Sequence, residues 1–244
     1  IDPEKAHTLA IKSLKFNLIP SIFDESKNDP IFKTKFFDKE LDNPIGMAAG
    51  FDKNAEVYNA LFKLGFGFVE VGTITPLKQY GNPKPRVFRL VEDQALINRL
   101  GFNNHGADVV RNRIRSENNL GLLGINIGPN KDTDDRLEDY LTGYKTFHEV
   151  ADYITINISS PNTENLRSFH EGNKLQDLLK SIMTERKNFK SNVPIAVKVS
   201  PDISEDQVYQ ITEILLEHEI KAIIVSNTSE AIRDKLRNIQ RHQK

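Results

Sequence analysis

Residues 153–167, YITINISSPNTENLR, begin with the pattern of a β-strand and end in a cluster of polar residues. The first half is dominated by residues that favour strands, namely Tyr153, Ile154, Ile156 and Ile158. Two serines, a proline and an asparagine then follow within residues 159–162. A plain turn needs only one or two such residues. The excess predicts a loop that binds a ligand at the end of a buried strand.

The same order recurs along the chain. Short β-rich runs lie at residues 45–49, 66–71, 122–127, 153–158, 195–199 and 222–225. Three segments between or after them show the helical spacing of apolar residues: Leu137, Leu141 and Tyr144; Leu175, Leu178, Leu179 and Ile182; Val208, Ile211, Ile214 and Leu215. Ser204 is placed as the N-cap of the last helix, with Gln207 at the capping-box position. Strands that alternate with helices predict a parallel α/β sheet.

Each strand ends in polar or glycine-rich sequence. These ends read AGFDKN, GTITP, NIGPNKD, NISSPN, KVSPD and SNTS. In an α/β barrel the ligand site is built from loops at the C-terminal ends of many strands, whereas a doubly wound sheet binds mainly at one switch point. The pattern therefore predicts a (β/α)8 TIM barrel. Six of its eight strand–helix units are recognisable, and a short N-terminal helical extension precedes them.

Composition excludes several classes of function. The 244 residues carry 33 basic and 34 acidic side chains, a formal charge of −1, so no basic surface indicates nucleic acid. The absence of cysteine excludes disulfides, thiolate metal sites and a cysteine nucleophile or base. The six histidines show no metal-ligand spacing, so no metal is expected. No apolar run reaches the ~18 residues that span a membrane.

Residues 1–40 differ from the rest, and we treat them as a separate region from residues 41–244. Ala6, Leu9, Ala10, Ser13 and Leu14 form a short amphipathic stripe, and further apolar residues follow at positions 16–23. Two interpretations remain open. The stripe belongs either to a helix packed on the domain or to an apolar element that docks on a membrane surface.

Lysines and asparagines at the strand ends are candidate ligand contacts. Lys53 follows a run of small residues, where a flat ligand can approach the backbone, and could pair with an anionic substrate; the alternative is a solvated loop lysine. Asn126 and Asn157 each lie inside a strand, where an unpaired amide costs roughly 1–3 kcal/mol, which favours a polar ligand at the barrel mouth. The asparagines of residues 97–106 fit either a ligand with amide edges or a simple turn.

Lys198 and Ser160 are the candidates for chemistry. Lys198 interrupts a β-branched run, and a lysine there is rarely buried without a partner. It could stabilise negative charge on a cofactor, form a Schiff base as in aldolases, or lie exposed on an edge strand. Ser160 has no obvious histidine–aspartate relay nearby, so acyl transfer is weakly supported. It could accept an acidic proton, or simply cap a turn.

Taken together, the motifs resemble those of one family. MAAGFDKNAE, EVGTITP, GNPKPRVFRL, INRLGFNNHGAD, GINIGPNKDT, INISSPNTENLR, VPIAVKVSPD and VSNTS look like the motif series of quinone-dependent (class 2) dihydroorotate dehydrogenases, in the same order. The resemblance implies an FMN-bearing barrel that oxidises dihydroorotate to orotate in pyrimidine (UMP) biosynthesis. Class 1 relatives use cysteine as the base, so the lack of cysteine fits the serine type.

The resemblance also assigns roles to residues. It implies that Ser160 removes the C5 proton while hydride passes from C6 to flavin N5. The implied FMN contacts are Ala49, Gly50, Thr73, Asn126, Asn157, Lys198 and Ser226. The implied dihydroorotate contacts are Lys53, Asn98, Gly101, Phe102, Asn157, Asn162, Asn227 and Thr228. Lys198 would stabilise negative charge at N1–C2 of reduced flavin.

In class 2 relatives the N-terminal helices form a membrane-facing quinone tunnel. The resemblance therefore places His7 and Arg89 near the quinone and favours the docking interpretation of residues 1–40. It implies a peripheral protein of an inner membrane, either the bacterial cytoplasmic membrane or the mitochondrial one.

In the family pattern, two more strand–helix units and a GGLSG-like loop that grips the FMN phosphate follow the last residues seen here. We therefore expect a C-terminally truncated chain that folds poorly or self-associates and holds FMN weakly. An inactive fragment with weak ligand binding, or a Schiff-base aldolase using Lys198, remain the alternative functions. If the barrel curvature is kept, the side chains of Lys53, Asn126, Asn157, Ser160, Lys198 and Asn227 should face one cavity.

Overall fold

The computed structural model describes residues 1–18, 30–161, 166–231 and 233–238. Its main element is a parallel sheet of six strands in the order β10-β9-β8-β7-β4-β3. The strands are β3 (Gly46–Met47), β4 (Phe68–Ile74), β7 (Leu122–Ile127), β8 (Tyr153–Asn157), β9 (Ile195–Val199) and β10 (Ala222–Val225). Each predicted run overlaps one of these strands, and neighbours in the sheet are neighbours among the six runs. This arrangement is that of consecutive strand–helix units of a barrel.

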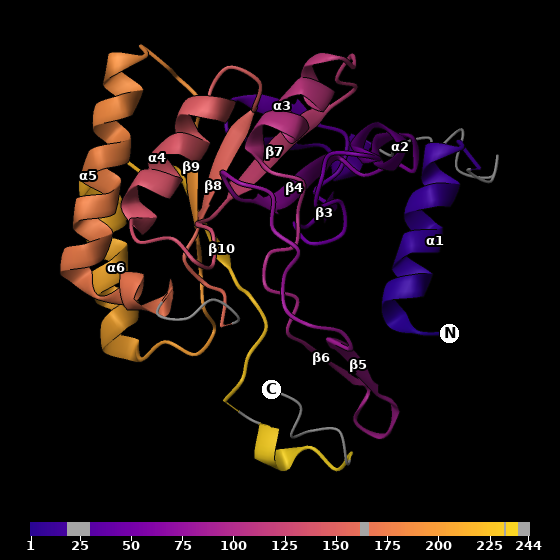
Figure 1. Cartoon of the computed structure of the whole chain (residues 1–244). Coiled ribbons are helices and arrows are strands. Elements are labelled where there is room, and N and C mark those ends of the chain that lie inside the picture. The colour runs from indigo at the N-terminus through magenta and orange to yellow at the C-terminus, as the bar shows by residue number, and fades with distance from the viewer. Residues whose placement is uncertain (19–29, 162–165, 232, 239–244) are drawn as a thin grey trace.

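Helices connect these strands and cover one face of the sheet. They are α2 (Tyr58–Lys63), α3 (Ala107–Arg115), α4 (Arg136–Phe147), α5 (Gly172–Asn188) and α6 (Glu205–Glu217). Figure 1 shows α4, α5 and α6 side by side on the outer face of β7–β9. The predicted capping box of α6 is confirmed, because Ser204 and Gln207 bond reciprocally. Short 3₁₀ helices lie at η2 (Pro30–Phe32), η3 (Val91–Asp93), η4 (Leu166–His170) and η5 (Arg233–Lys235).

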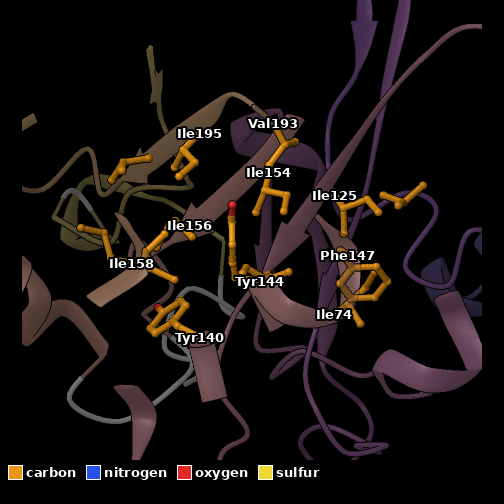
Figure 2. Packing of buried hydrophobic residues seen from close by; sticks show 14 of the residues in the cluster. Ile74, Ile125, Tyr140, Tyr144, Phe147, Ile154, Ile156, Ile158, Val193 and Ile195 are labelled. Carbon is orange, nitrogen blue, oxygen red and sulfur yellow. The ribbon is translucent and has the colours of Figure 1, made fainter. Parts of the chain in front are cut away.

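Alternation along the strands divides the buried residues into two sets. One set faces the helices and forms the main core, in which Ile125, Ile154 and Ile156 pack against Tyr144 and neighbouring residues of α4. Figure 2 shows this packing, with ten of its residues labelled. Because side chains alternate with period two, the intervening residues of the same strands point to the opposite face. That opposite face is the interior of the barrel, and it carries the polar residues noted in the sequence.

The N-terminal end of the barrel interior is filled by apolar side chains. A hairpin of β1 (Thr34–Phe36) and β2 (Lys39–Leu41) packs there, and its Phe36 stacks on Phe68 of β4. Tyr153 and Ala196 complete the cluster from β8 and β9. The predicted boundary at residue 40 falls within β2, and residues on both sides of it pack with the barrel. The hairpin was not predicted because three-residue strands carry almost no periodic signal.

A second hairpin, β5 (Val87–Leu90) and β6 (Ala95–Asn98), extends from the C-terminal side of β4. The segment after β10 returns to this hairpin, as Figure 1 shows in yellow. There Leu236 packs against the cluster of Phe88, Leu90 and Ile97. The backbone N–H groups of Arg237 and Asn238 donate to the carboxylate of Asp93, at 2.9 Å each. These contacts join the last described residues to the middle of the chain.

The N-terminal stripe forms the helix α1 (Pro3–Lys15). Ile11 of α1 is buried in the main core, and Glu4 pairs with the buried guanidinium of Arg86 at 2.9 Å. Packing on the domain is therefore established for α1, while Leu9, Phe16 and Leu18 remain exposed. The apolar residues Ile19, Ile22 and Phe23 lie outside the described residues. Within the described parts of the chain, no helix has the length and apolar character needed to cross a bilayer.

Candidate active site

The polar strand ends meet at a cavity of about 210 Å³ at the C-terminal edge of the sheet. Its lining consists of Ala49, Gly50, Lys53, Gly72, Thr73, Asn98, Leu100, Gly101, Phe102, Asn157, Ser160, Lys198, Asn227 and Thr228. These residues come from β4, β6, β8, β9 and the loops that follow β3, β6, β8 and β10. The structure thus gathers into one lining most of the residues predicted to contact FMN or dihydroorotate.

Glycines form part of the cavity wall. Gly50 has a φ of +113°, and a Cβ added there would meet no atom within 4 Å, so this backbone faces open space. Gly72 shares the same φ, and its Cβ would lie 2.4 Å from the Asn126 carbonyl oxygen. Both conformations disfavour residues with a side chain. The Gly50 N–H donates to the Gly72 carbonyl at 2.8 Å, which holds the loop after β3 against the end of β4.

Asp52 fixes the conformation of this loop. Its buried carboxylate accepts from the N–H groups of Glu56 and Val57 at 2.8 Å each, and from that of Asn54 at 3.3 Å. Burial raises the pKa of the Asp52 carboxyl, and the three backbone donors oppose that shift. Nothing in the sequence pattern indicated this role beyond a polar residue in a loop.

Lys53 is half-buried at the cavity and donates to the carbonyl of Gly50. Burial lowers the pKa of Lys53, and the nearby guanidinium of Arg86 lowers it further, whereas Glu4 and Asp52 act in the opposite direction. An anionic ligand beside Lys53 would favour its charged form. The geometry therefore suits pairing with a carboxylate and does not support the alternative of a solvated loop lysine.

Asn157 lines the cavity, but Asn126 does not. Asn126 is fully buried, and its amide group is engaged on both sides: Nδ2 donates to Glu70 at 2.9 Å, and Oδ1 accepts from Thr73 at 2.6 Å. The expectation that six side chains face one cavity thus holds for five, with Asn126 one layer beneath them. Direct contact between Asn126 and FMN stays a prediction. Glu70 was missed, although a charge inside a β-rich run was the same signal that singled out Lys198.

Ser160 is buried at the cavity wall, directly after β8. The neighbouring Ser159 donates through Oγ to Asn157 Oδ1 at 2.6 Å and accepts from Asn227 Nδ2 at 2.9 Å. These bonds hold the loops after β8 and β10 together. Ser226 donates to the Asn227 carbonyl and is absent from the described lining of the cavity, and Asn162 lies outside the described residues. The roles predicted for Ser226 and Asn162 remain predictions.

Lys198 is half-buried and extends into the cavity from β9. Its ammonium group makes no hydrogen bond or ion pair with any residue that the structure describes. A long cationic side chain that enters a cavity without a protein partner is suited to contact an electron-rich ligand. The alternative of an exposed edge-strand lysine does not fit, because β9 is flanked by β8 and β10.

Two further residues, not singled out from the sequence, anchor the loop that carries Ser160. Arg167 donates through Nε to the Ser159 carbonyl at 3.3 Å and pairs with Asp202 at 3.3 Å. His170 is buried; its Nδ1 lies 2.9 Å from the Arg167 carbonyl, and its Nε2 accepts from the Ser200 N–H at 3.2 Å. This pattern requires a neutral ring with the proton on Nδ1, and burial lowers the pKa of His170 accordingly.

Of the two residues predicted to lie near a quinone, His7 lies in the N-terminal helix and Arg89 contacts the start of the chain. His7 of α1 lies edge-on to Phe51 and bonds through Nε2 to the Phe51 carbonyl at 2.7 Å. Arg89 of β5 donates to the carbonyl of Ile1 at 2.7 Å. Their proximity to a quinone stays a prediction. In the described residues, no group of three or more histidine, aspartate or glutamate side chains is placed to hold a metal ion.

The cavity fits the ring portion of a flavin. Gly50 leaves room where a side chain would intrude, Lys198 supplies a cation without a protein partner in the described residues, and Asn157 and Thr73 supply polar groups along one wall. A planar ring with hydrogen-bonding edges matches this set of small, amide and cationic residues. The residues present therefore agree with the ring of a flavin, and the choice of FMN as that flavin stays a prediction.

Known proteins similar to this chain point the same way. Residues 31–243 match the family model described as dihydroorotate dehydrogenase. A protein of Rhizobium leguminosarum named dihydroorotate dehydrogenase (quinone) is 47% identical over 232 residues, which cover 93% of this chain and 64% of the relative. A protein of Bradyrhizobium diazoefficiens with the same name is 45% identical over 99% of this chain and 66% of the relative. The chain thus spans just under two thirds of the length of these relatives.

Solved structures confirm the fold class. A crystal structure of DHODH from Eimeria tenella in complex with ferulenol superposes with a TM-score of 0.93 at 36% sequence identity. The match covers 99% of this chain and 71% of that one. A ligand-free structure of the Eimeria protein gives a TM-score of 0.91 over 74% of its length. The six parallel strands and their helices are therefore the strand–helix units of a TIM barrel.

Proposed function

This chain belongs to the dihydroorotate dehydrogenase family, and on that premise we propose that it acts in the flavin-dependent oxidation of dihydroorotate to orotate. The electron acceptor is a quinone, and the reaction serves pyrimidine biosynthesis. Family membership supports the reaction type, and the names of the similar proteins support the quinone. FMN is the proposed cofactor.

One observation supports this function most strongly. Lys53, Ser160 and Lys198 come from three different strand ends and line the same cavity together with the amides of Asn157 and Asn227. An anion partner, a hydroxyl that can take a proton and a second cation are the groups that oxidation of a cyclic carboxylic acid by a flavin requires. None of these residues alone indicates this function. Their placement around one cavity does.

Binding of dihydroorotate would rely on charge and on amide pairing. The substrate is a cyclic ureide with one carboxylate, so it offers both donors and acceptors around its ring. Lys53 would pair with the carboxylate, because it is the cation of the wall that includes Gly50. Asn98, Asn157 and Asn227 present amide groups toward the ureide. The oxygens of Asn157 and Asn227 already accept from Ser159 and Thr228, so these two amides would donate through their second N–H. Gly101 and Phe102 complete this side of the cavity.

Proton removal would fall to Ser160. The hydroxyl lies at the C-terminal end of β8, buried at the cavity wall. It would take the C5 proton of dihydroorotate and pass it on toward solvent. The chemistry that FMN supplies when bound is acceptance of the C6 hydride and later release of electrons to the quinone. Lys198 would place its positive charge beside the ring that gains electron density.

The quinone would be delivered at α1. Leu9 of this helix and Phe16 at its C-terminal cap are 59% and 76% exposed. We propose that these residues contact the lipid phase or the quinone tail, and that the protein associates with the surface of an inner membrane. The contact of His7 with Phe51 holds α1 against the loop after β3, and the contact of Arg89 with Ile1 keeps the start of the chain close to the hairpin β5–β6.

Orotate formation tests the proposal directly. The full natural chain, reconstituted with FMN, is given dihydroorotate and a soluble quinone, and orotate is followed by its absorbance. We expect turnover that is lost in Lys198→Met and retained in Lys180→Met, a matched change at an exposed lysine on α5. A folded, FMN-loaded wild-type protein that forms no orotate would overturn the proposed function.

A further inference from the structure

Glu70 is a buried carboxylate inside the barrel, on the interior face of β4. It is 3% exposed and forms no salt bridge with any described residue. Three donors converge on it instead: Asn126 Nδ2 at 2.9 Å, Tyr153 Oη at 3.0 Å and Thr155 Oγ1 at 2.8 Å. Burying a carboxylate costs free energy unless hydrogen-bond donors surround it. The three donors around Glu70 therefore indicate that the carboxylate has a specific role.

A continuous chain of hydrogen bonds leads from Glu70 to the cavity at the C-terminal edge of the sheet. Asn126 accepts from Thr73 at 2.6 Å, and Thr73 accepts from Asn157 Nδ2 at 2.9 Å. Asn157 Oδ1 accepts from Ser159 Oγ at 2.6 Å, and Ser159 Oγ accepts from Asn227 Nδ2 at 2.9 Å. Every donor in this chain points toward Glu70. The chain links β4, β7, β8 and the loop after β10.

The common direction follows from the chemistry of the end group. An ionised carboxylate only accepts, so Asn126 must turn its NH₂ group toward Glu70 and its carbonyl toward Thr73. The Thr73 hydroxyl must then donate to Asn126, which leaves its lone pairs for Asn157. Ser159 and Asn227 continue the chain with the same direction of donation. The negative charge thus decides which way the Asn126 amide and the Thr73 hydroxyl are turned, and the backbone N–H groups of Ser159 and Thr228 hold Asn157 and Asn227 in the matching direction.

The surroundings of Glu70 preserve this polarity. Tyr153 reaches Glu70 because Gly124 leaves space: a Cβ at Gly124 would lie 2.1 Å from the Tyr153 ring. Burial raises the pKa of Tyr153 and the charge of Glu70 raises it further, so the phenol keeps its proton and donates. The apolar cluster that contains Leu122 and Ala196 lies on the other side and limits access of water.

We propose that Glu70 is a positioning residue that, through Asn126, sets the direction of the Thr73 hydroxyl at the cavity wall and keeps that hydroxyl able to accept from Asn157. The proposal rests on the proposed function, because the cavity is taken to hold FMN and dihydroorotate. Glu70 itself does not line the cavity in the described structure. Its effect on ligands passes only through the hydrogen-bond chain.

The variant Glu70→Gln disrupts the direction of the chain at nearly constant volume. The hydroxyls of Tyr153 and Thr155 would engage the carbonyl of the new side chain and leave its NH₂ group facing the NH₂ group of Asn126. Asn126 must then flip, which offers Thr73 a donor instead of an acceptor. Asn157 cannot follow freely, because its Oδ1 also accepts from the Ser159 N–H at 3.1 Å. The chain is left with a mismatched pair.

The double variant Glu70→Gln with Asn126→Asp restores the direction. The carboxylate introduced at position 126 would only accept, so it takes the NH₂ group of the new glutamine on one side and the Thr73 hydroxyl on the other. From Thr73 to Asn227 the original pattern returns. Tyr153→Phe serves as the matched control, since it removes a donor to the same carboxylate but leaves the chain from Asn126 to Asn227 intact.

Affinity for FMN and the visible spectrum of bound flavin are measured on the full natural chain, with thermal unfolding as a check on folding. We expect Glu70→Gln to weaken FMN binding by at least about tenfold, the scale of a lost charged hydrogen bond, and to alter the spectrum. The double variant and Tyr153→Phe should return wild-type spectra. Wild-type affinity and spectrum in a folded Glu70→Gln protein would overturn the proposal.

If Glu70→Gln does not fold, the double variant alone tests the proposed role of Glu70. A folded double variant with the wild-type flavin spectrum supports the proposal, and one that binds FMN as weakly as unfolded protein contradicts it. Failure of the wild-type chain itself to bind FMN would contradict the proposed function and not the role of Glu70.

Discussion

Asn157 and Lys198 are register partners on the neighbouring parallel strands β8 and β9, and both side chains enter the same cavity. Their situations differ. The Asn157 amide is bonded on both sides, to Thr73 and to Ser159, whereas the Lys198 ammonium has no partner in the described part of the chain. The Asn157 side chain is therefore held in place before a ligand binds, whereas the Lys198 ammonium group is available to contact the ligand. This contrast is typical of a site that is largely formed in advance.

Replacing Lys53 should weaken binding of the product orotate. Loss of a charge-assisted contact predicts a decrease of about 10- to 100-fold for Lys53→Met, measured by titration of the FMN-loaded protein with orotate. Lys35→Met, at an exposed lysine of β1, is the control and should bind normally. Equal affinities for the two variants would contradict the pairing of Lys53 with the carboxylate.

The same contact predicts a dependence on pH. Burial lowers the pKa of Lys53 from its ordinary value of 10.5 in the ligand-free protein. Only the protonated form pairs with an anion, so orotate affinity should fall as the pH rises through this lowered pKa, before a free lysine would titrate. In Lys53→Met this decline should be absent.

Ser160→Ala should slow flavin reduction without greatly affecting binding. The loss of a general base is expected to lower the rate by roughly 10²-fold or more, as followed in a rapid-mixing experiment under anaerobic conditions. The affinity for dihydroorotate should change little, because a serine hydroxyl is a small part of the lining. Reduction at the wild-type rate would exclude Ser160 as the base.

The exposed apolar residues of α1 should matter for the acceptor half of the reaction. The double variant Leu9→Ser with Phe16→Ser is expected to leave flavin reduction by dihydroorotate unchanged and to slow reoxidation by a long-chain quinone. Leu216→Ser, at a similarly exposed position of α6, should affect neither step. If the α1 variant reoxidises normally, packing on the domain is the whole role of this helix.

His170 should make stability depend on pH. Its folded pKa is lowered by burial from the ordinary value of 6.5, so its neutral form stabilises the fold fully above about 6.5, and this contribution is lost as the pH falls toward the lowered pKa. His170→Gln keeps a donor and an acceptor but does not titrate. The difference in unfolding free energy between wild type and variant should therefore shrink on acidification, and parallel curves would refute the assignment.

The sequence predicted best where a strand is an unbroken run of mostly β-branched or apolar residues, whether it is buried on both faces, as β7 and β9 are, or partly exposed, as β10 is. The bounds of β7, β9 and β10 coincide with the runs recognised at residues 122–127, 195–199 and 222–225. A run of β-branched residues between polar loops leaves few other possibilities. The hairpins β1–β2 and β5–β6 escaped notice because strands of three or four residues depend on tertiary partners more than on their own pattern.

Within the site, the residues that face the ligand were easier to predict than those that hold them. Lys53, Asn157, Ser160 and Lys198 lie at or just after strand ends, where polar residues are conspicuous. Glu70, Asp52 and His170 act through partners that only the fold brings near, such as Asn126 on another strand and Ser200 after β9. The spacing of these residues along the sequence does not indicate that the fold brings them into contact.

The most direct test of the account is anaerobic mixing of the FMN-loaded full natural chain with dihydroorotate, while the oxidised-flavin absorbance is recorded. The convergence of Lys53, Ser160 and Lys198 on one cavity predicts rapid bleaching and formation of one orotate per flavin. Bleaching should be slow in Ser160→Ala and normal in Lys35→Met. A wild-type protein that binds FMN but keeps its oxidised spectrum in the presence of dihydroorotate would contradict the central claim.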